Sequence, residues 1–189
     1  MKKYLIGIGA AAIIALAAAC GASDDAGTNH SQTESTGEHN EQDIAFAQMM
    51  IPHHQQAVDM AKMAVEKATD PKVLDLASRI EGAQDPEIRQ MTTMLEQWDA
   101  PTGSTVESMP GMDHGEGMMT DEEMTQLEQS TGADFDRLWL RMMIRHHEGA
   151  VTMAKTELDR GGDSEAKDLA KRIVDAQEAE IAEMRAMLT

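Results

Sequence analysis

Two short runs of the chain combine methionine with histidine. "MMIPHH" occupies residues 49–54 and "MMIRHH" occupies residues 142–147, in a chain with seven histidines. Residues four positions apart in a helix lie one turn apart on the same side, so each methionine can reach the histidine four positions after it, as Met49 can reach His53. Thioether sulfur and imidazole nitrogen together suit soft transition-metal ions such as Cu(I). The residues of this predicted metal site are Met49, Met50, His53, His54, Met142, Met143, His146 and His147.

Each run is followed by a segment that places a glutamate among apolar residues. In "AQDPEIRQMTTML" (83–95) and "AQEAEIAEMRAML" (176–188), Glu87 and Glu180 share a helical stripe with isoleucine and methionine. A buried carboxylate needs a cation, a hydrogen-bond donor or a proton. We therefore include Glu87 and Glu180 as candidate metal ligands. The alternative is a histidine–glutamate hydrogen-bond network that fixes the helix register without any ion.

A second group of soft ligands lies in "MPGMDHGEGMM", residues 109–119, between the two runs. Its glycines oppose a rigid helix, and flexible thioether ligands suit Cu(I) better than Cu(II), although another transition metal stays possible. In an exported protein, methionine also avoids the disulfide formation that threatens a thiolate site. The residues of this predicted secondary site are Met109, Met112, His114, Met118 and Met119.

The doubled motif belongs to a longer duplication. Residues 43–95 align without a gap with residues 136–188, with 24 identities in 53 positions. Each copy reads as two amphipathic helices joined by a short breaker, "ATDP" or "RGGD", and so short a breaker forces an antiparallel hairpin. Two such hairpins bury their apolar faces against each other, which predicts an all-α, ferritin-like four-helix bundle. The expected helices are 43–67, 71–98, 134–160 and 164–188.

Three details qualify this fold. Pro52 and Pro86 each remove a backbone donor from a helix, which predicts a kink or restart at each, with Asp85 capping the second. In the join between the copies, Thr120 and Glu123 have capping-box spacing and predict a short helix. The bundle is thus expected over 43–189, divided into repeat 1 (43–98), a Met/His-rich connector (99–133) and repeat 2 (134–189).

The first 42 residues are typical of an exported lipoprotein. Residues 1–19 join a basic start to a short apolar run and lead into Cys20, the only cysteine, which is the expected lipidation site. Residues 20–42 are polar and predict a disordered tether, with His30 and His39 as solvated histidines. The protein is therefore expected on the outer face of the cell membrane. The formal net charge of −18 argues against nucleic acid as a partner.

"FDRLWLRMMIRHHEGAVTMAK" (135–155), "FAQMMIPHHQQAVDMAK" (46–62) and the "AQxxEIxxM" continuation resemble the domain of unknown function 305 family over residues 43–188. The resemblance implies a ferritin-like bundle and a metal role for His53, His54, His146 and His147 with the adjacent methionines. Some members of that family are linked to extracytoplasmic copper binding or copper tolerance. The resemblance supplies no reaction.

These observations favour an extracytoplasmic protein that sequesters or delivers copper, with no catalytic residues and with a copper-donor or copper-acceptor protein as a possible partner. A ferritin-like di-metal oxidoreductase is one alternative, but its usual Glu-x-x-His spacing occurs nowhere in the chain. A metal-free binding or structural module of the cell envelope is the other alternative. The sequence leaves open the number of ions, the oligomeric state and whether the two histidine pairs share one site.

Overall fold

The computed structural model describes residues 38–102 and 117–189, and this part of the chain contains five helices. The all-α bundle is confirmed, and its four long helices begin and end within two residues of the expected positions. Cys20, Met109, Met112 and His114 lie outside the described residues, as does the export signal. The helices are α1 (Glu41–Lys67), α2 (Pro71–Gln97), α3 (Asp121–Gln129), α4 (Gly132–Arg160) and α5 (Ser164–Met187).

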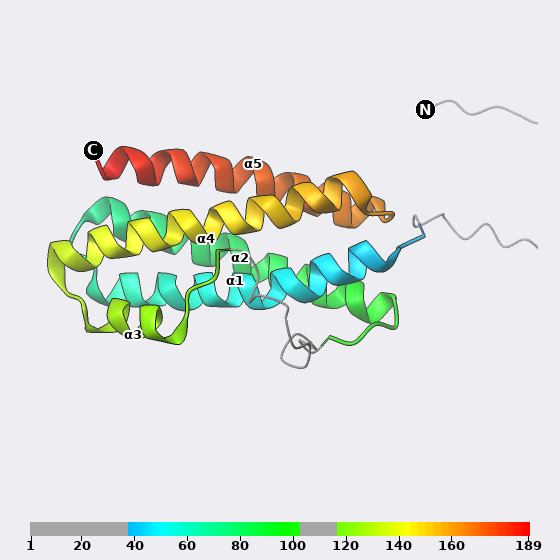
Figure 1. Cartoon of the computed structure of the whole chain (residues 1–189), viewed down its shortest axis with the longest axis horizontal. Coiled ribbons are helices and arrows are strands. Elements are labelled where there is room, and N and C mark those ends of the chain that lie inside the picture. Colours follow the sequence, from blue (N-terminus) through cyan, green and yellow to red (C-terminus); the bar gives the residue numbers. More distant parts are fainter. Residues whose placement is uncertain (1–37, 103–116) are drawn as a thin grey trace, which may run out of the picture. The chain divides into compact units, whose positions relative to one another are not determined.

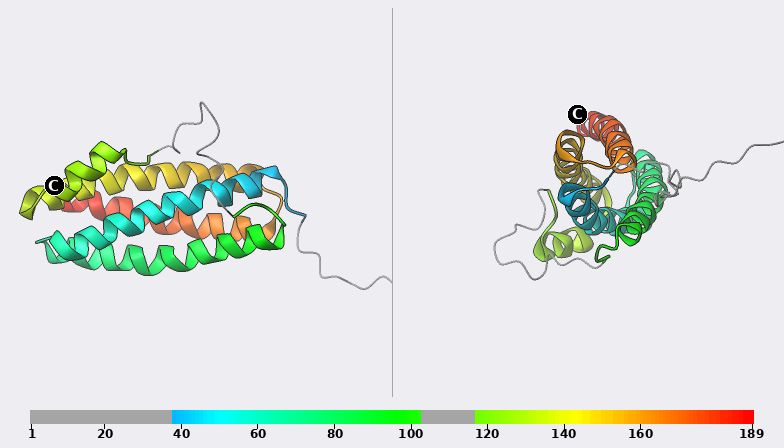
Figure 2. Two further views of the ribbon diagram at one scale, coloured as in Figure 1. Left: turned by 90° about the horizontal axis from the view of Figure 1, so that it is seen from below. Right: turned by 90° about the vertical axis from the view of Figure 1, so that its right-hand side faces the viewer.

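The four long helices form two antiparallel hairpins, α1–α2 and α4–α5 (Figure 1). The hairpins meet chiefly through α1 and α4, which run in opposite directions. In the end-on view of Figure 2 the four helices surround a common centre, and α3 lies outside them. The two copies of the repeat are thereby related by an approximate two-fold axis that crosses the α1–α4 contact.

Side-chain caps begin most of the helices, and the predicted capping box of Thr120 is among them, but the prolines do not interrupt the helices. Asn40 and Thr120 form capping boxes, and the Asp70 side chain caps α2 with Pro71 at its first position. α1 continues through Pro52 and α2 through Pro86, so Asp85 lies inside α2 and the predicted restart is wrong. Each proline costs its helix one backbone hydrogen bond. The packing of the residues on both sides of the proline outweighs this cost, so the helix stays continuous.

Each repeat caps the interhelical turn of the other repeat. The buried Asp136 carboxylate of α4 accepts hydrogen bonds from the backbone N–H groups of Thr69 and Asp70, both at 3.0 Å, in the α1–α2 turn. The buried Asp43 of α1 accepts equivalent bonds of 3.0 and 2.9 Å from Gly162 and the next residue, in the α4–α5 turn. These reciprocal bonds satisfy the backbone donors of both turns and fix the two hairpins against each other.

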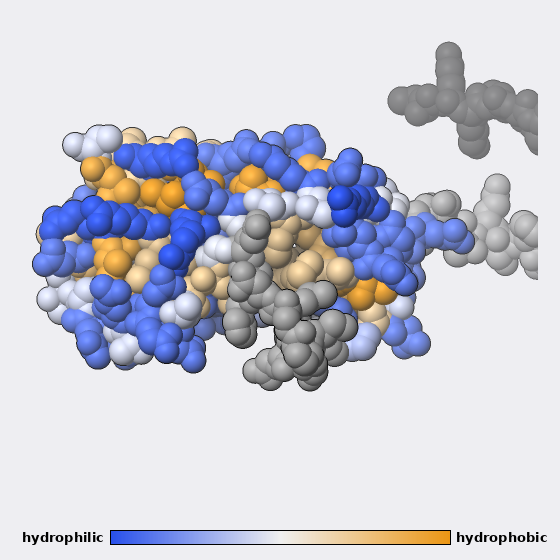
Figure 3. Space-filling model, viewed as in Figure 1, coloured by the Kyte–Doolittle hydropathy of each residue, from blue (hydrophilic) through white to orange (hydrophobic). Residues whose placement is uncertain are grey.

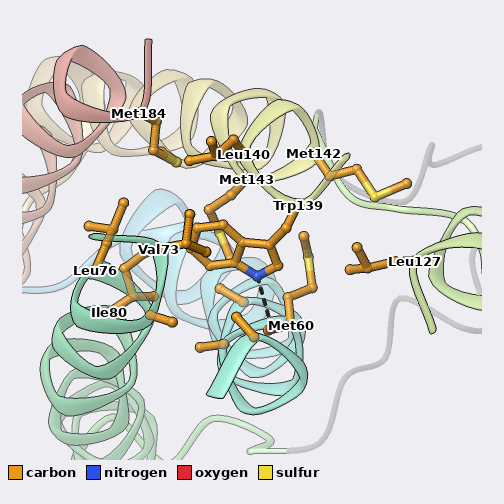
Figure 4. Packing of buried hydrophobic residues seen from close by; sticks show 14 of the residues in the cluster. Met60, Val73, Leu76, Ile80, Leu127, Trp139, Leu140, Met142, Met143 and Met184 are labelled. Carbon is orange, nitrogen blue, oxygen red and sulfur yellow. Dashed lines mark hydrogen bonds between the residues drawn. The ribbon is translucent and has the colours of Figure 1, made fainter. Parts of the chain in front are cut away.

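The apolar core consists of two clusters related by the repeat. One contains Trp139, whose indole N–H donates to the Met60 carbonyl at 2.9 Å (Figure 4). The other contains Phe46, which occupies the position in repeat 1 that Trp139 occupies in repeat 2. On each long helix, one cluster takes residues before the middle and the other takes residues after it, with Val151 of α4 as the exception. The residues between the clusters are polar, and they form the candidate site.

The outer surface is largely hydrophilic on the face seen in Figure 3, with the edges of hydrophobic residues visible along the line between α4 and α5. Val151 and Ile181 line a shallow hollow at that line. None of the described helices combines the length and the hydrophobicity that crossing a membrane requires.

Candidate metal centre

A layer of polar side chains crosses the middle of the bundle between the two apolar clusters. α1 and α4 contribute the four histidines of the doubled motif, each at most 1% exposed, and α2 and α5 contribute two glutamines, each 3% exposed. The glutamines occupy equivalent positions in the two repeats, as do the histidine pairs. We call this set the central polar layer, and its members are His53, His54, Gln84, His146, His147 and Gln177.

His53 and His146 meet where α1 crosses α4. Their ring centroids are 3.7 Å apart and their planes are inclined by 41°. Burial, and then the neighbouring imidazoles of His53 and His147, hold the pKa of His146 well below its usual value. His146 is therefore neutral at physiological pH, which is the protonation state that binds a metal ion.

His54 and His147 each contact a glutamate from the second helix of the same repeat. The Nε2 atom of His54 lies 2.8 Å from Oε2 of Glu87, and the Nε2 atom of His147 lies 2.8 Å from Oε2 of Glu180. A carboxylate at this distance accepts a hydrogen bond from the Nε2–H group. The proton of a neutral imidazole is then on Nε2, and its lone pair is on Nδ1. Among the described residues, neither Nδ1 atom has a hydrogen-bond partner. Each glutamate thus contacts the Nε2 side of its histidine ring, away from Nδ1.

This arrangement is the one that metal-binding histidines commonly adopt, with one ring nitrogen on a carboxylate and the other directed at the ion. Within the described residues, no three His, Cys, Asp or Glu side chains are grouped closely enough to hold an ion. A metal ion bound in this layer would therefore need ligands besides histidine and carboxylate. The donors present fit a soft ion that accepts a few imidazole and thioether ligands better than a hard ion that requires six or more oxygens.

The four methionines of the doubled motif divide between two environments. Met50 and Met143 are fully buried in the two apolar clusters, on opposite sides of the central polar layer. Figure 4 places Met143 against Trp139, whereas Met142 extends toward Leu127 of α3. Met142 is 6% exposed and its equivalent, Met49, is half-buried. The sequence pairs each methionine with a histidine one turn away, and the structure adds that Met50 and Met143 also serve the core.

The described end of the connector is fixed beside the histidines. The Gln56 side chain, one turn after His53, donates to the carbonyl of Met119 at 2.9 Å and accepts from its N–H at 2.7 Å. Nη2 of Arg145, the residue before His146, lies 2.8 Å from the Met119 sulfur. Of the predicted connector ligands, Met119 is thus held against α1 and α4 next to the central polar layer, and Met118 precedes it half-buried. Neither Gln56 nor Arg145 was predicted from the sequence.

A buried carboxyl pair at one end of the bundle was also not predicted. Glu157 is fully buried beside Asp43, in a position where repeat 1 has Ala64. Burial first, and then the hydrogen bond and the charge of Asp43, raise the pKa of Glu157 to about 8. Burial opposes ionisation of Asp43, but hydrogen bonds from Glu157 and from backbone N–H groups lower its pKa overall. The pair therefore shares one negative charge at neutral pH, with the proton on Glu157.

The same end of the bundle overturns the prediction for His39. Its imidazole stacks on the Trp98 indole, with ring centroids 5.2 Å apart and planes inclined by 16°. α1 begins at Glu41, so the last residues of the predicted tether are part of the bundle. No periodic signal precedes the first helix, which is why the sequence did not indicate this contact.

Comparison with known proteins identifies relatives over the whole bundle. The family model described as "Domain of unknown function (DUF305)" matches residues 43–188, which confirms the resemblance. A crystal structure of a predicted secreted DUF305 protein from Streptomyces coelicolor is 35% identical, with a TM-score of 0.71, and the match covers 78% of this chain and 91% of that one. A DUF305 fragment from Deinococcus radiodurans is also 35% identical, with a TM-score of 0.72 and coverage of 79% and 97%.

CopM in its Cu(II)-bound form is similar as well, at 35% identity and a TM-score of 0.68, with 77% of this chain and 95% of that chain covered. Structures of CopM in Cu(I)-bound, Ag-bound and apo forms match similarly. Among curated proteins, a stretch of 55 residues is 36% identical to protein L153 of Acanthamoeba polyphaga mimivirus. That match spans about a third of the length of the viral protein, 36%.

Proposed function

Because this chain belongs to the DUF305 family, we propose that it is a copper-binding protein of the cell exterior that sequesters or delivers the ion, with the central polar layer as its main site. CopM, which matches over most of the bundle, has been crystallised with Cu(I), Cu(II) and Ag. The observation in this chain that carries the proposal is the duplicated histidine–carboxylate pair with a free Nδ1, His54 with Glu87 and His147 with Glu180.

The residues would share the work as follows. Nδ1 of His54 and Nδ1 of His147 would bind the ion, and Glu87 and Glu180 would hold those rings in the required tautomer. His53 and His146 would complete the imidazole set at the α1–α4 contact. Met50 and Met143, and the more accessible Met49 and Met142, would supply the thioether sulfur that favours Cu(I) over Cu(II).

The connector would provide the route by which the ion enters or leaves. Gln56 and Arg145 fix Met119 against α1 and α4, beside the helix segments that carry His53 and His146. Weak, exchangeable thioether ligands there, with His114, suit transfer of copper to or from a partner protein. Lipidation at Cys20 would hold the bundle at the outer face of the membrane; the secreted relative from Streptomyces coelicolor supports export.

A metal-free role is the second candidate, and one observation favours it. The two histidine–glutamate hydrogen bonds of 2.8 Å satisfy part of the central polar layer without any ion and can fix the helix register. Under that account, copper leaves the thermal unfolding temperature unchanged, whereas a ligand of the native state must raise it. The absence of Glu-x-x-His spacing from the chain argues against a ferritin-like di-metal oxidoreductase.

Competition for Cu(I) against a chromogenic chelator tests the proposal. Glu87→Gln with Glu180→Gln keeps the volume of both side chains but removes the charge behind each imidazole. Loss of a carboxylate that is hydrogen-bonded to a metal-binding imidazole is expected to weaken binding by about 10- to 100-fold. Glu96→Gln with Glu178→Gln changes two exposed glutamates of the same two helices and serves as the control. Equal affinity for the wild type and both variants, or an equal loss in both variants, would refute the proposed site.

A further inference from the structure

A pocket of about 240 Å³ opens at one end of the bundle. α1 begins, α2 ends and α5 begins at that end (Figure 1). His39 and Trp98 form one part of its lining through their stacked rings. Met94, the residue with a thioether, also lines the pocket, as do the acidic residues Glu38 and Glu165. We call this feature the His39 pocket. It lies beyond one apolar cluster from the central polar layer and shares no residue with it.

The α1 side of the pocket is held in place by hydrogen bonds. The Asn40 side chain accepts from the N–H of Gln42 at 2.7 Å and donates to the Arg160 carbonyl at 3.0 Å, which ties the start of α1 to the end of α4. The Asn40 N–H in turn donates to Asp43 at 2.6 Å. His39 therefore adjoins a fixed residue, although the sequence before it predicts a tether.

The Trp98 side of the pocket is fixed by the way α2 ends. Asp99 has a positive φ of 53°, its N–H donates to the Glu96 carbonyl at 3.2 Å, and the Ala100 N–H donates to the Leu95 carbonyl at 2.9 Å. These two bonds form a Schellman motif, which holds Trp98 at the helix terminus. The Gln48 side chain of α1 then donates to the Pro101 carbonyl at 3.0 Å and secures the chain beyond the turn.

The donor types in this pocket suit a soft cation. An imidazole nitrogen and a thioether sulfur are ligands for Cu(I) and Ag(I), and an indole face attracts a cation. A metal ion bound to an imidazole nitrogen lies in the plane of that ring. The His39 and Trp98 planes are inclined by only 16°. An ion in the imidazole plane, at the edge of His39 nearer the indole, is therefore as far from the indole plane as a stacked ring is. Glu38 and Glu165 make the entrance negative, which raises the local concentration of cations.

A hard divalent ion fits less well. Ca²⁺ and Mg²⁺ require about six or more oxygen ligands. Of the carboxylates in the lining, Asp163 already accepts the Ala166 N–H at 2.9 Å as the cap of α5. Repeat 2 has Gly132 at the position of His39, so the arrangement exists at one end of the bundle only.

We propose that the His39 pocket is a second metal site, which binds a soft monovalent cation, Cu(I) or Ag(I), through His39 and Met94 with Trp98 covering the ion. It goes beyond the function proposed above, because the ligands, the position in the bundle and the single copy all differ from the duplicated histidine layer. Its partial exposure makes it an entry site, where an ion exchanges more rapidly than in the buried layer.

Tryptophan emission during titration with Ag(I), which stands in for Cu(I) without redox chemistry, tests this inference. Trp139→Phe leaves Trp98 as the sole tryptophan, and the equivalent position in repeat 1 is already phenylalanine. The expected result is saturable quenching of Trp98, with at least tenfold weaker binding in His39→Ala and in Met94→Leu. Met91→Leu changes a buried methionine of α2 outside the pocket lining and should leave the titration unaltered.

Two further arms separate this site from the central polar layer. The quenching of Trp98 should persist when His54 and His147 are both changed to Ala, so failure of the layer to bind copper leaves this inference standing. In the wild-type protein, the indole N–H signals of Trp98 and Trp139 in NMR spectra give the same readout without a tryptophan substitution. Absence of an Ag(I) effect on Trp98, or the same effect in His39→Ala and Met94→Leu as in the parent, would overturn the inference.

Discussion

Glu157→Gln tests the buried carboxyl pair at the α4–α5 turn. Glu157 lies against Asp43, and Gly161 leaves it the necessary space because a Cβ atom there would overlap the Glu157 carboxyl group. The facing groups are Asp43, whose charge raises the pKa of Glu157, and Gln42 and Lys167, which act in the opposite direction. Glutamine has nearly the same volume and can still donate to Asp43, so the substitution imitates the protonated acid at every pH.

The magnitude follows from the pKa of Glu157, which is about 8 in the folded protein against the usual 4.5 for a glutamate side chain. Between these two values the folded state binds a proton that the unfolded state releases, so the free energy of unfolding falls by about 1.4 kcal/mol for each pH unit. The stabilisation is complete below pH 4.5 and is lost by about pH 8. The variant should therefore gain on the wild type across this window, by up to roughly 5 kcal/mol in total.

His146 changes the shape of the wild-type profile but leaves the difference between the two proteins intact. Since the pKa of His146 is well below 6.5, the unfolded state binds the additional proton below that pH, and stability rises as the pH increases to 6.5. This opposes the effect of Glu157 in the acidic half of the window. The wild type should therefore lose stability mainly in the upper part of the window, toward pH 8, while the variant should rise and then level off.

Urea unfolding at several pH values between 4.5 and 8.5 measures both profiles. Glu148→Gln, an exposed site on the same helix, controls for the loss of one charge from α4. The reasoning would be refuted by a constant difference between Glu157→Gln and the wild type over this range, or by a difference that shrinks as the pH rises.

Three further substitutions test the fold. Asp99→Gly should raise the free energy of unfolding by about 0.5–1 kcal/mol, because Asp99 has a φ of 53° that glycine adopts without strain; urea unfolding with an unchanged m-value measures this. Asp136→Ala should cost about 3 kcal/mol, since it leaves the buried donors of the α1–α2 turn without their acceptor, and hydrogen exchange at Thr69 should accelerate. Trp139→Phe should cost about 1–3 kcal/mol through packing and the lost bond to the Met60 carbonyl; a calorimetric cost near zero would contradict the assigned hydrogen bond.

The sequence predicted the long helices well because their signals are local. Asp70 with Pro71 and the "RGGD" breaker mark the turns, and the duplication confirms each assignment with a second copy. The restart at Pro86 was wrong because the tendency of proline to break a helix is also local, whereas the packing of Gln84 and Met91 on either side is not. The prediction therefore failed at Pro86, where long-range packing and not the local sequence determines the structure.

The residue types of the site could be predicted from the sequence, but the contacts between these residues could not. The duplicated histidines identified four members of the central polar layer, yet the sequence could not show that Glu87 is hydrogen-bonded to His54. Glu157 breaks the repeat at Ala64, and only that asymmetry could have indicated it. The contact of His39 with Trp98 joins residues 59 positions apart without any repeated or periodic pattern, so only the fold reveals it.

X-ray absorption at the copper K-edge tests the central claim most directly. The His39→Ala variant loaded with one equivalent of Cu(I) excludes the His39 pocket and leaves the central polar layer to bind the ion. We predict a spectrum with both imidazole nitrogen and thioether sulfur neighbours, and loss of the imidazole contribution when His54 and His147 are also changed to Ala. A spectrum without imidazole scattering, or one that those two substitutions leave unaltered, would contradict the assignment of copper to the histidine layer.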